Sequence, residues 1–400
     1  MKELYIIDSK YIICEMAGKL YLVDTKSNAE NEISTSMHDL LNPFFIACDL
    51  NAAYQIVRKK YESLSRADFD EIVKGLIEKK ILIPYVCKKN VKELNVGGMF
   101  GADLVDISDA LKHQFYDVVF MGFPYDISAT FKAGSRFAPA YLRQESKAVF
   151  QYVDNDGTVP GMWDCVNDRY VLEDVRLADC GDLRKDVYER NGEEFDYLRN
   201  SIKRMISKNI FPVIFGGDHS ISLATISGCS EVKHKIGVFQ FDAHDDYGGN
   251  VEGIDWKKAC HHGNFMSWVM EKEEVEVVGQ IGIRQLNPRK ETSPKLFRWS
   301  YRNIDQIYQG IVEKMRKDIP YYITFDVDCL SPTVITSTGT PLPGGFLYDD
   351  LMELIRKICT DYDIIGLDIV ELIPGQNNEG IIISRIVLDI IDYVMKKRKV

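Results

Sequence analysis

The chain of 400 residues is long enough for two or three domains, and its hydrophobic share of 46% and charged share of 27% are typical of folded globular proteins. A net charge of −11 argues against a nucleic-acid partner, because phosphate backbones attract clustered positive charge. No apolar run reaches about 18 residues and no signal-peptide pattern is visible, so we expect neither a membrane span nor export. Nine scattered cysteines without a CxxC pair favour a reducing cytoplasm over a disulfide framework.

The first part of the chain has the pattern of short strands followed by helices. We expect strands at 4–7, 11–14 and 19–23, and helices at 35–41, 51–61 and 67–80. Ser65 precedes the last helix as a cap, and a β-like run at 81–83 ends at Pro84. These elements predict a small α+β domain over residues 1–95. The polar, glycine-containing stretch that follows predicts a linker over 96–114.

From residue 115 to residue 400 the pattern alternates between strand and helix. Strand-length apolar runs occur at 117–123, 176–179, 212–215, 236–241, 275–283, 321–325 and 364–369. Helical patterns occur between them, at 193–207, 304–317 and 349–360. Runs that are apolar on both faces predict an α/β fold in which helices cover both sides of a parallel sheet. Ligands of such sheets bind at the carboxyl ends of the strands.

Three polar clusters begin where three of these apolar runs stop. They are Gly-Gly-Asp-His-Ser at 216–220, Asp-Ala-His-Asp-Asp at 242–246 and Asp-Val-Asp at 326–328. Side chains two residues apart in an extended segment point to the same side, so Asp242 should share a face with His244, and Asp326 with Asp328. One cluster alone could be a turn or a helix cap, but three at the ends of separate strands indicate a site.

The chemistry of these clusters predicts two bound cations. Two imidazoles and four carboxylates would converge on one sheet edge, where unneutralised carboxylates repel one another or take up protons. A pair of divalent ions would neutralise them, and mixed carboxylate and imidazole ligands suit manganese better than calcium or structural zinc. Two metals at such a site can activate a water for hydrolysis. The candidate ligands are His219, Asp242, His244, Asp246, Asp326 and Asp328.

These motifs resemble those of the ureohydrolase family, which contains arginases, agmatinases, guanidinobutyrases and formiminoglutamases. Further similar segments follow in family order over about residues 115 to 400. They are Gly-Phe-Pro-Tyr-Asp at 122–126, Gly-Ser-Arg-Phe at 134–137, Asp-Cys-Gly-Asp at 179–182, Gly-Ile-Arg at 282–284, Gly-Thr-Pro at 339–341 and Gly-Leu-Asp-Ile-Val-Glu at 366–371. The resemblance implies a three-layer arginase-like fold and hydrolysis of a guanidino C–N bond, which releases urea and an amine.

The resemblance also implies roles for individual residues. One manganese ion would be bound by His219, Asp242, Asp246 and Asp326, and the second by His244, Asp242, Asp326 and Asp328. Asp246 would relay a proton, His262 would act as proton shuttle, and Glu371 would hold the guanidinium of the substrate. The neighbouring His261 is the alternative candidate for the proton shuttle, but it lies one position away from the family motif. Without the metal clusters, Glu371 would be interpreted as a salt-bridged end of a strand.

Departures from the family pattern bear on the substrate. Ser331 precedes Pro332 where the family usually has an aspartate, which could change metal affinity. Gly248 and Lys258 occupy positions where arginases have an asparagine and a serine for the α-groups of free arginine, so free arginine is disfavoured. The motifs are closer to agmatinases, although Asn264-Phe265-Met266 departs from the agmatinase pattern. The alternatives are a peptide arginase that converts peptidyl arginine to ornithine, and a catalytically silent binding homologue.

The N-terminal domain is an addition to the ureohydrolase pattern. Its order of strands and helices resembles a winged-helix unit of the kind that recognises leader peptides on enzymes that modify ribosomal peptides. Lysines and arginines in this region are balanced by acidic residues, which argues against DNA binding. An oligomerisation or packing role is the alternative. By analogy with the family we expect a homo-oligomer that acts on a small guanidino compound or an arginine-containing peptide.

Overall fold

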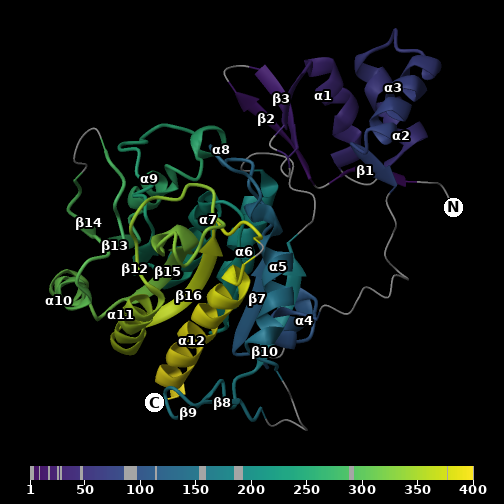
Figure 1. Ribbon diagram of the computed structural model, residues 1–400. Coiled ribbons are helices and arrows are strands. Elements are labelled where there is room, and N and C mark those ends of the chain that lie inside the picture. The colour runs from purple at the N-terminus through teal and green to yellow at the C-terminus, as the bar shows by residue number, and fades with distance from the viewer. Residues whose placement is uncertain are drawn as a thin grey trace. The chain divides into compact units, whose positions relative to one another are not determined.

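The computed structural model describes residues 4–8, 10–16, 19–24, 27, 29–45, 48–84, 97–112, 115–152, 159–183, 192–287, 292–375 and 377–399. The chain divides into two compact units, the first running to Asn95 and the second beginning at Val96 (Figure 1). Among the described residues, no helix is both long enough and apolar enough to cross a membrane.

The first unit contains two small antiparallel sheets and three helices. One sheet has the order β5-β1-β6 and the other β2-β3-β4. Their bounds are β1 Leu4–Ile7, β2 Tyr11–Met16, β3 Lys19–Asp24, β4 Ala29–Ile33, β5 Cys48–Asp49 and β6 Leu82–Pro84. The helices are α1 Thr35–Leu41, α2 Leu50–Lys60 and α3 Arg66–Glu78, and Ser65 caps α3 by accepting a hydrogen bond from the Asp68 backbone N–H. The predicted elements are confirmed, but β4 and β5 were missed because both are short and polar or half-exposed.

The second unit is built on an eight-stranded parallel sheet of order β10-β7-β11-β16-β15-β12-β13-β14. Its strands are β7 Val118–Gly122, β10 Leu177–Asp182, β11 Phe211–Phe215, β12 Ile236–Phe241, β13 Val275–Ile281, β14 Leu296–Trp299, β15 Pro320–Asp326 and β16 Asp363–Val370. Strands β11 and β12 are buried at every position, as expected for a sheet covered on both faces. A separate hairpin pairs β8 Met162–Asp164 with β9 Arg169–Val171.

Helices pack on both faces of this sheet, which confirms the predicted three layers. Helix α12 contacts both α5 and α11, and α11 contacts α10. Helices α6, α7 and α9 form a second group, in which α7 packs on β12, β15 and β16 (Figure 1). The bounds are α4 Ile107–Lys112, α5 Ala138–Glu145, α6 Glu193–Ser207, α7 Ser222–Lys233, α8 Trp256–Ala259, α9 Phe265–Met270, α10 Ile304–Lys314, α11 Tyr348–Asp361 and α12 Glu379–Lys399.

The segment expected to be a linker differs from the prediction. Met99 and Phe100 are fully buried in the core of the second unit, and the Met99 backbone N–H donates to the Asp179 carboxylate at 2.8 Å. Helix α4 follows within the same stretch. One of the glycines that suggested a linker serves packing instead: a Cβ on Gly98 would lie 2.4 Å from Cβ of Asp179. Residues 97–112 therefore belong to the second unit.

The register of the sheet aligns the carboxyl ends of its four central strands. Phe215 of β11 pairs with Ile369 of β16, Ile369 pairs with Phe325 of β15, and Phe325 pairs with Phe241 of β12. The residues that follow these strands therefore emerge side by side at one edge. This alignment brings together the three polar clusters and the segment that begins with Glu371.

Candidate metal centre

The first group of converging side chains surrounds the Nδ1 atom of His219. This nitrogen lies 3.0 Å from Asp242 Oδ2, 3.1 Å from Asp246 Oδ2 and 3.4 Å from Asp326 Oδ2. All four residues are buried. Candidate ligand atoms of His219, Asp242 and Asp246 lie within 4.8 Å of one another, which is close enough for all three to contact one ion.

A second group lies next to the first and shares Asp242 with it. Nδ1 of His244 lies 3.0 Å from Asp328 Oδ2 and 3.6 Å from Asp242 Oδ1. The candidate ligand atoms of Asp242, His244 and Asp328 again lie within 4.8 Å of one another. The structure thus brings together all six side chains singled out in the sequence, in two groups joined by one carboxylate.

Backbone N–H groups fix the direction of these carboxylates. Asp328 Oδ1 accepts from the Ala243 N–H at 3.0 Å, and Asp326 Oδ1 accepts from the Asp328 N–H at 2.8 Å. Asp242 Oδ1 accepts from the His244 N–H at 2.6 Å. In Asp326 and Asp328, the other oxygen faces a histidine of the centre. Such outer contacts orient metal ligands before any ion binds.

The local backbone differs from the extended segments that the sequence suggested. Strand β15 ends at Asp326, and Asp328 lies in the 3₁₀ turn η6 Val327–Cys329. Asp242 likewise follows the end of β12. The residues of each cluster converge because the chain turns tightly after the strand, and not because side chains alternate along it. Asp246 reaches the centre from a backbone with φ of 44°, a left-handed conformation that costs energy in a residue other than glycine.

The electrostatics of the cluster reflect four acids in a small buried volume. Burial, followed by the charges of Asp328 and Asp242, raises the pKa of Asp326 well above its usual value. Burial and Asp242 also raise the pKa of Asp246, to about 7. Burial lowers the pKa of His244, but Asp242 and Asp328 outweigh it and raise that pKa to about 12. Without cations, protons would have to balance these charges.

The hydrogen bonds of His219 test whether the residues fit a metal ion. Its Nε2 is 2.9 Å from the Thr324 hydroxyl, which in turn donates to Ser222 Oγ at 3.0 Å. This chain assigns the ring proton to Nε2, which leaves a lone pair on Nδ1. Among the described residues, no hydrogen bond of acceptable geometry reaches that buried Nδ1, although three carboxylate oxygens face it. A cation between the lone pair and the carboxylates would satisfy all of these atoms.

His262 and Glu371 lie beside this centre. His262 Nδ1 is 3.1 Å from Glu371 Oε1, and the same oxygen accepts from the His219 backbone N–H at 2.9 Å. Glu371 follows the end of β16 with φ of 62°, again a left-handed conformation. Both residues are buried. Glu371 thus pairs with His262 through Oε1 at the end of a strand, whereas within the described part of the chain its Oε2 accepts no hydrogen bond.

Two further residues, Ser128 and Thr130, hold His262 and were missed in the sequence. The Ser128 hydroxyl accepts from the His262 backbone N–H at 3.0 Å. The Thr130 backbone N–H and hydroxyl lie 3.1 Å and 2.7 Å from His262 Nε2. Both residues lie in a loop more than 130 positions before His262, so no local pattern connects them. The available signal was the Gly-Phe-Pro-Tyr-Asp motif immediately before the loop.

The glycine pair of the first cluster has a steric function. A Cβ on Gly217 would lie 1.4 Å from the Tyr125 carbonyl oxygen, so only glycine allows the two segments to approach. The Asp218 N–H donates to the same carbonyl at 2.7 Å, and the Asp218 carboxylate accepts from the Ser220 and Ser128 N–H groups. Asp218 is thus a cap, in agreement with the interpretation as a turn.

Two positions where the sequence departs from the family pattern make local contacts. The Ser331 hydroxyl contacts the Thr333 hydroxyl, and the Gly248 N–H donates to Ser267 Oγ.

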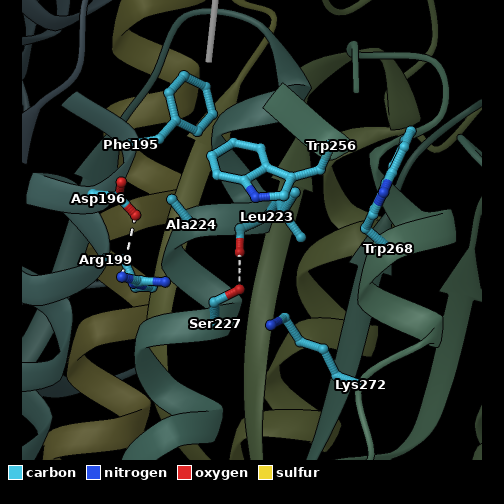
Figure 2. A pocket seen from close by; sticks show the side chains of 9 residues that line it. All are labelled: Phe195, Asp196, Arg199, Leu223, Ala224, Ser227, Trp256, Trp268 and Lys272. Atoms are coloured by element: carbon cyan, nitrogen blue, oxygen red, sulfur yellow. Dashed lines mark hydrogen bonds and ion pairs between the residues drawn. The ribbon is translucent and has the colours of Figure 1, made fainter. Parts of the chain in front are cut away.

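A separate cavity lies beside α6, α7 and α9, and none of the six converging side chains lines it. It has an empty volume of about 470 Å³, which includes solvent at its mouth. Figure 2 shows the Lys272 ammonium reaching toward Ser227 below two tryptophans. The lining residues are Phe195, Asp196, Arg199, Leu223, Ala224, Ser227, Trp256, Trp268 and Lys272.

The chain is similar to known proteins over most of its second unit. The model of the arginase family matches residues 116–396. An agmatinase of Sodalis glossinidius is 31% identical over 274 residues, covering 66% of this chain and 82% of the relative. A guanidinobutyrase of Pseudomonas aeruginosa is 28% identical over 278 residues, with coverage of 66% and 81%. A proclavaminate amidinohydrolase of Streptomyces clavuligerus is 27% identical over 282 residues, with coverage of 66% and 83%.

Solved structures show the same fold. A hypothetical agmatinase from Burkholderia thailandensis superposes with a TM-score of 0.63 at 21% identity, covering 76% of this chain and 91% of the other. Formimidoylglutamase from Bacillus subtilis gives a TM-score of 0.58 at 20% identity, with coverage of 85% and 98%. The sequence match begins after the first unit, at residue 116. On these grounds the chain belongs to the arginase family of ureohydrolases, and its first hundred or so residues lie outside the family match.

Proposed function

We propose that the second unit binds two manganese ions and hydrolyses a guanidino C–N bond, releasing urea and an amine. The observation that carries this proposal is the buried Nδ1 lone pair of His219, which faces three carboxylates without a hydrogen bond. The relatives named above as agmatinase, guanidinobutyrase and proclavaminate amidinohydrolase support the reaction class.

The residues that would hold the ions follow from the two groups. His219, Asp242, Asp246 and Asp326 would hold one ion, and His244, Asp242, Asp326 and Asp328 the other. When bound, such a pair supplies Lewis acidity and an activated water. The protein itself contributes the orientation of the carboxylates, which is set by backbone N–H groups and, at Asp242, also by the Gln240 side-chain amide.

His262 and Glu371 would serve the substrate beside the ions. Glu371 Oε1 is engaged by His262 and by the backbone of His219, which leaves Oε2 to accept from a guanidinium. That contact would orient the carbon for attack. His262 would hold a proton and pass it to the departing nitrogen. Asp246, whose pKa is raised by burial, would relay a proton within the centre.

For the substrate we propose agmatine or a compound like it, with peptidyl arginine as the second candidate. Gly248 and Lys258 provide no side chain of the kind that would hold the α-carboxylate and α-ammonium of free arginine. An arginine within a peptide also lacks both free α-groups. The unmatched N-terminal unit favours this second candidate, in which the unit would recognise a peptide. Assembly into a homo-oligomer remains a prediction.

A substrate panel tests the reaction and the choice between the two candidates. We expect the manganese-loaded protein to release urea from agmatine at a rate at least about 100-fold above that from free arginine, since a buried unpartnered charge is costly. Urea formation is measured for agmatine, free arginine and an arginine-containing peptide under the same conditions. Faster release from the peptide would select the peptide arginase. Urea from none of the three would contradict the proposed activity.

Removal of the metal should lower stability independently of any activity. A ligand that binds only the folded state at 100 to 1,000 times its Kd stabilises by roughly 3–4 kcal/mol. For a unit of this size that corresponds to a rise in Tm on the order of 5–10 °C on adding manganese to chelated protein. Differential scanning calorimetry of wild type and Asp242→Asn measures the rise, and the variant should lose most of it because both groups share Asp242.

The matched control is Asp318→Asn, which changes an exposed aspartate paired with Arg316. It should keep the full manganese-dependent rise. An equal rise in wild type and Asp242→Asn would place the binding elsewhere. No rise in either, together with less than one manganese per chain, would favour the catalytically silent homologue.

A further inference from the structure

Both ring nitrogens of His262 are engaged by the protein. Nδ1 contacts Glu371 Oε1 at 3.1 Å, and Nε2 contacts the Thr130 N–H at 3.1 Å and the Thr130 hydroxyl at 2.7 Å. The histidine itself is only 8% exposed, whereas Thr130 is exposed. Among the described residues, the Thr130 hydroxyl is thus the group that joins a buried imidazole to solvent.

The donors and acceptors assign the protons on this ring. A backbone N–H can only donate, so Nε2 accepts from Thr130 and Nδ1 carries the proton that it donates to Glu371. Burial lowers the pKa of His262, but Glu371 outweighs it, with smaller contributions from Asp218 and Asp246, and raises that pKa to about 9. When the ring takes a second proton, only Nε2 can receive it, because Nδ1 already carries one.

Thr130 has one group that suits each state of the ring. Its backbone N–H matches the unprotonated Nε2 only. Its hydroxyl can donate to Nε2 when the nitrogen is bare and can rotate to accept when the nitrogen carries a proton. The hydroxyl is therefore the group that allows both protonation states at the same 2.7 Å contact.

The reaction moves protons at several points of its cycle. A guanidinium and one water become an ammonium and urea without a net change in protons, but the water loses two protons and the departing nitrogen gains two. A buried histidine that stores one of these protons can be reset between turnovers by exchanging that proton with solvent.

We propose that the Thr130 hydroxyl is the outlet through which His262 exchanges its Nε2 proton with solvent. Nε2 passes its proton to Thr130 Oγ1 while the hydroxyl passes its own proton to a solvent water. One proton leaves the ring and no charge remains on the threonine. The reverse order reloads the ring. This inference rests on the proposed hydrolytic function, in which His262 stores a proton, and Thr130 is a positioning residue that acts through His262.

The loop that carries Thr130 is built to hold this contact. Asp126 at its start accepts from the backbone N–H of Gly134 at 2.7 Å and forms a buried ion pair with Arg136 at 2.5 Å. Within the loop, the Ser128 N–H donates to Asp218 and the Ser128 hydroxyl accepts from the His262 N–H. Hydrogen bonds thus hold the loop in place at Asp126 and at Ser128, and Thr130 lies two residues after Ser128.

Thr130→Val tests the outlet, because valine keeps the shape and the backbone N–H but lacks the hydroxyl. In the manganese-loaded protein we expect kcat to fall about 10- to 100-fold with KM within about twofold. Thr130→Ser should stay within about threefold of wild type. Small imidazole buffers should raise the turnover of Thr130→Val several-fold and leave wild type unchanged, since they replace the missing proton carrier. A purely structural role would not produce this buffer dependence.

A matched control and a second readout complete the test. Thr360→Val removes a hydroxyl that bonds only within α11 and should leave turnover unchanged. NMR of histidine-labelled protein measures how fast the His262 ring protons exchange with water, and Thr130→Val should slow this exchange even if no urea is released by the wild type. Absence of urea in wild type would overturn the proposed function alone. Unchanged exchange and unchanged kcat in Thr130→Val, or lost manganese in that variant, would overturn the outlet.

Discussion

Asp328→Ala is expected to bind about one manganese ion per chain instead of about two. We expect its kcat/KM to fall by about 1,000-fold or more, since a metal that polarises the substrate stabilises the transition state by several kcal/mol. Asp328 Oδ2 faces His244 at 3.0 Å while Oδ1 is held by the Ala243 N–H, so the side chain belongs to the second group alone. Elemental analysis of the reconstituted variant gives the metal content, and urea release gives the activity.

The control for this variant is Asp318→Ala, in which the same change is made at an exposed ion pair. It should retain both ions and activity within about twofold of wild type, as surface ion pairs contribute little. The first group, around His219, should keep its ion in Asp328→Ala because Asp242, Asp246 and Asp326 remain. Full turnover in Asp328→Ala would contradict the assignment of the second ion.

His262→Ala is expected to keep both manganese ions and to lower kcat by about 10²- to 10⁴-fold, the range typical of losing a positioned acid or base. Its ring contacts Glu371 and Thr130 and none of the six candidate ligands. Metal content and the manganese-dependent rise in Tm should therefore match wild type, while steady-state urea release should not.

The neighbouring histidine provides a sharp comparison for that variant. His261→Ala removes an imidazole whose Nδ1 accepts from the Gly263 N–H, outside the proposed machinery. Its kcat should remain within about threefold of wild type. Equal losses in His261→Ala and His262→Ala would show that the loop, and not one imidazole, limits the rate. Loss of metal in His262→Ala would move this residue into the ligand set.

The sequence was sufficient to predict that the six candidate ligands come together, because these residues lie where apolar runs end. Aligned parallel strands bring such residues together whatever the distance between them in the chain, as Phe215, Phe325 and Phe241 show. Thr130 could not be found in this way, because its contact with His262 depends on how a loop folds back. The left-handed backbone conformations of Asp246 and Glu371 could not be predicted either, because the residue types Asp and Glu do not indicate a positive φ.

The elements that were missed share a physical reason. Helix α7 is buried at each position from Ser222 to Ser230, so it shows no alternation between apolar and polar faces. Strand β14 is short and only partly buried, and the charged Arg298 interrupts its apolar pattern. The residues around Met99 were predicted to be a linker because glycines suggested flexibility, whereas there a glycine permits close packing. The apolar and polar pattern of a segment is least informative where contacts with the rest of the fold, and not exposure to solvent, determine which residues the segment contains.

The order of strands in the second unit has a consequence for the lifetime of the loaded state. The four strands that supply the centre and Glu371, β11, β16, β15 and β12, are the middle four of eight, and the sheet edges are β10 and β14. Partial opening of a domain begins at its least protected margins, while central strands separate only in global unfolding. Fraying at either edge would therefore leave the candidate centre intact, and ions bound there would be released by unfolding only as fast as the whole unit unfolds.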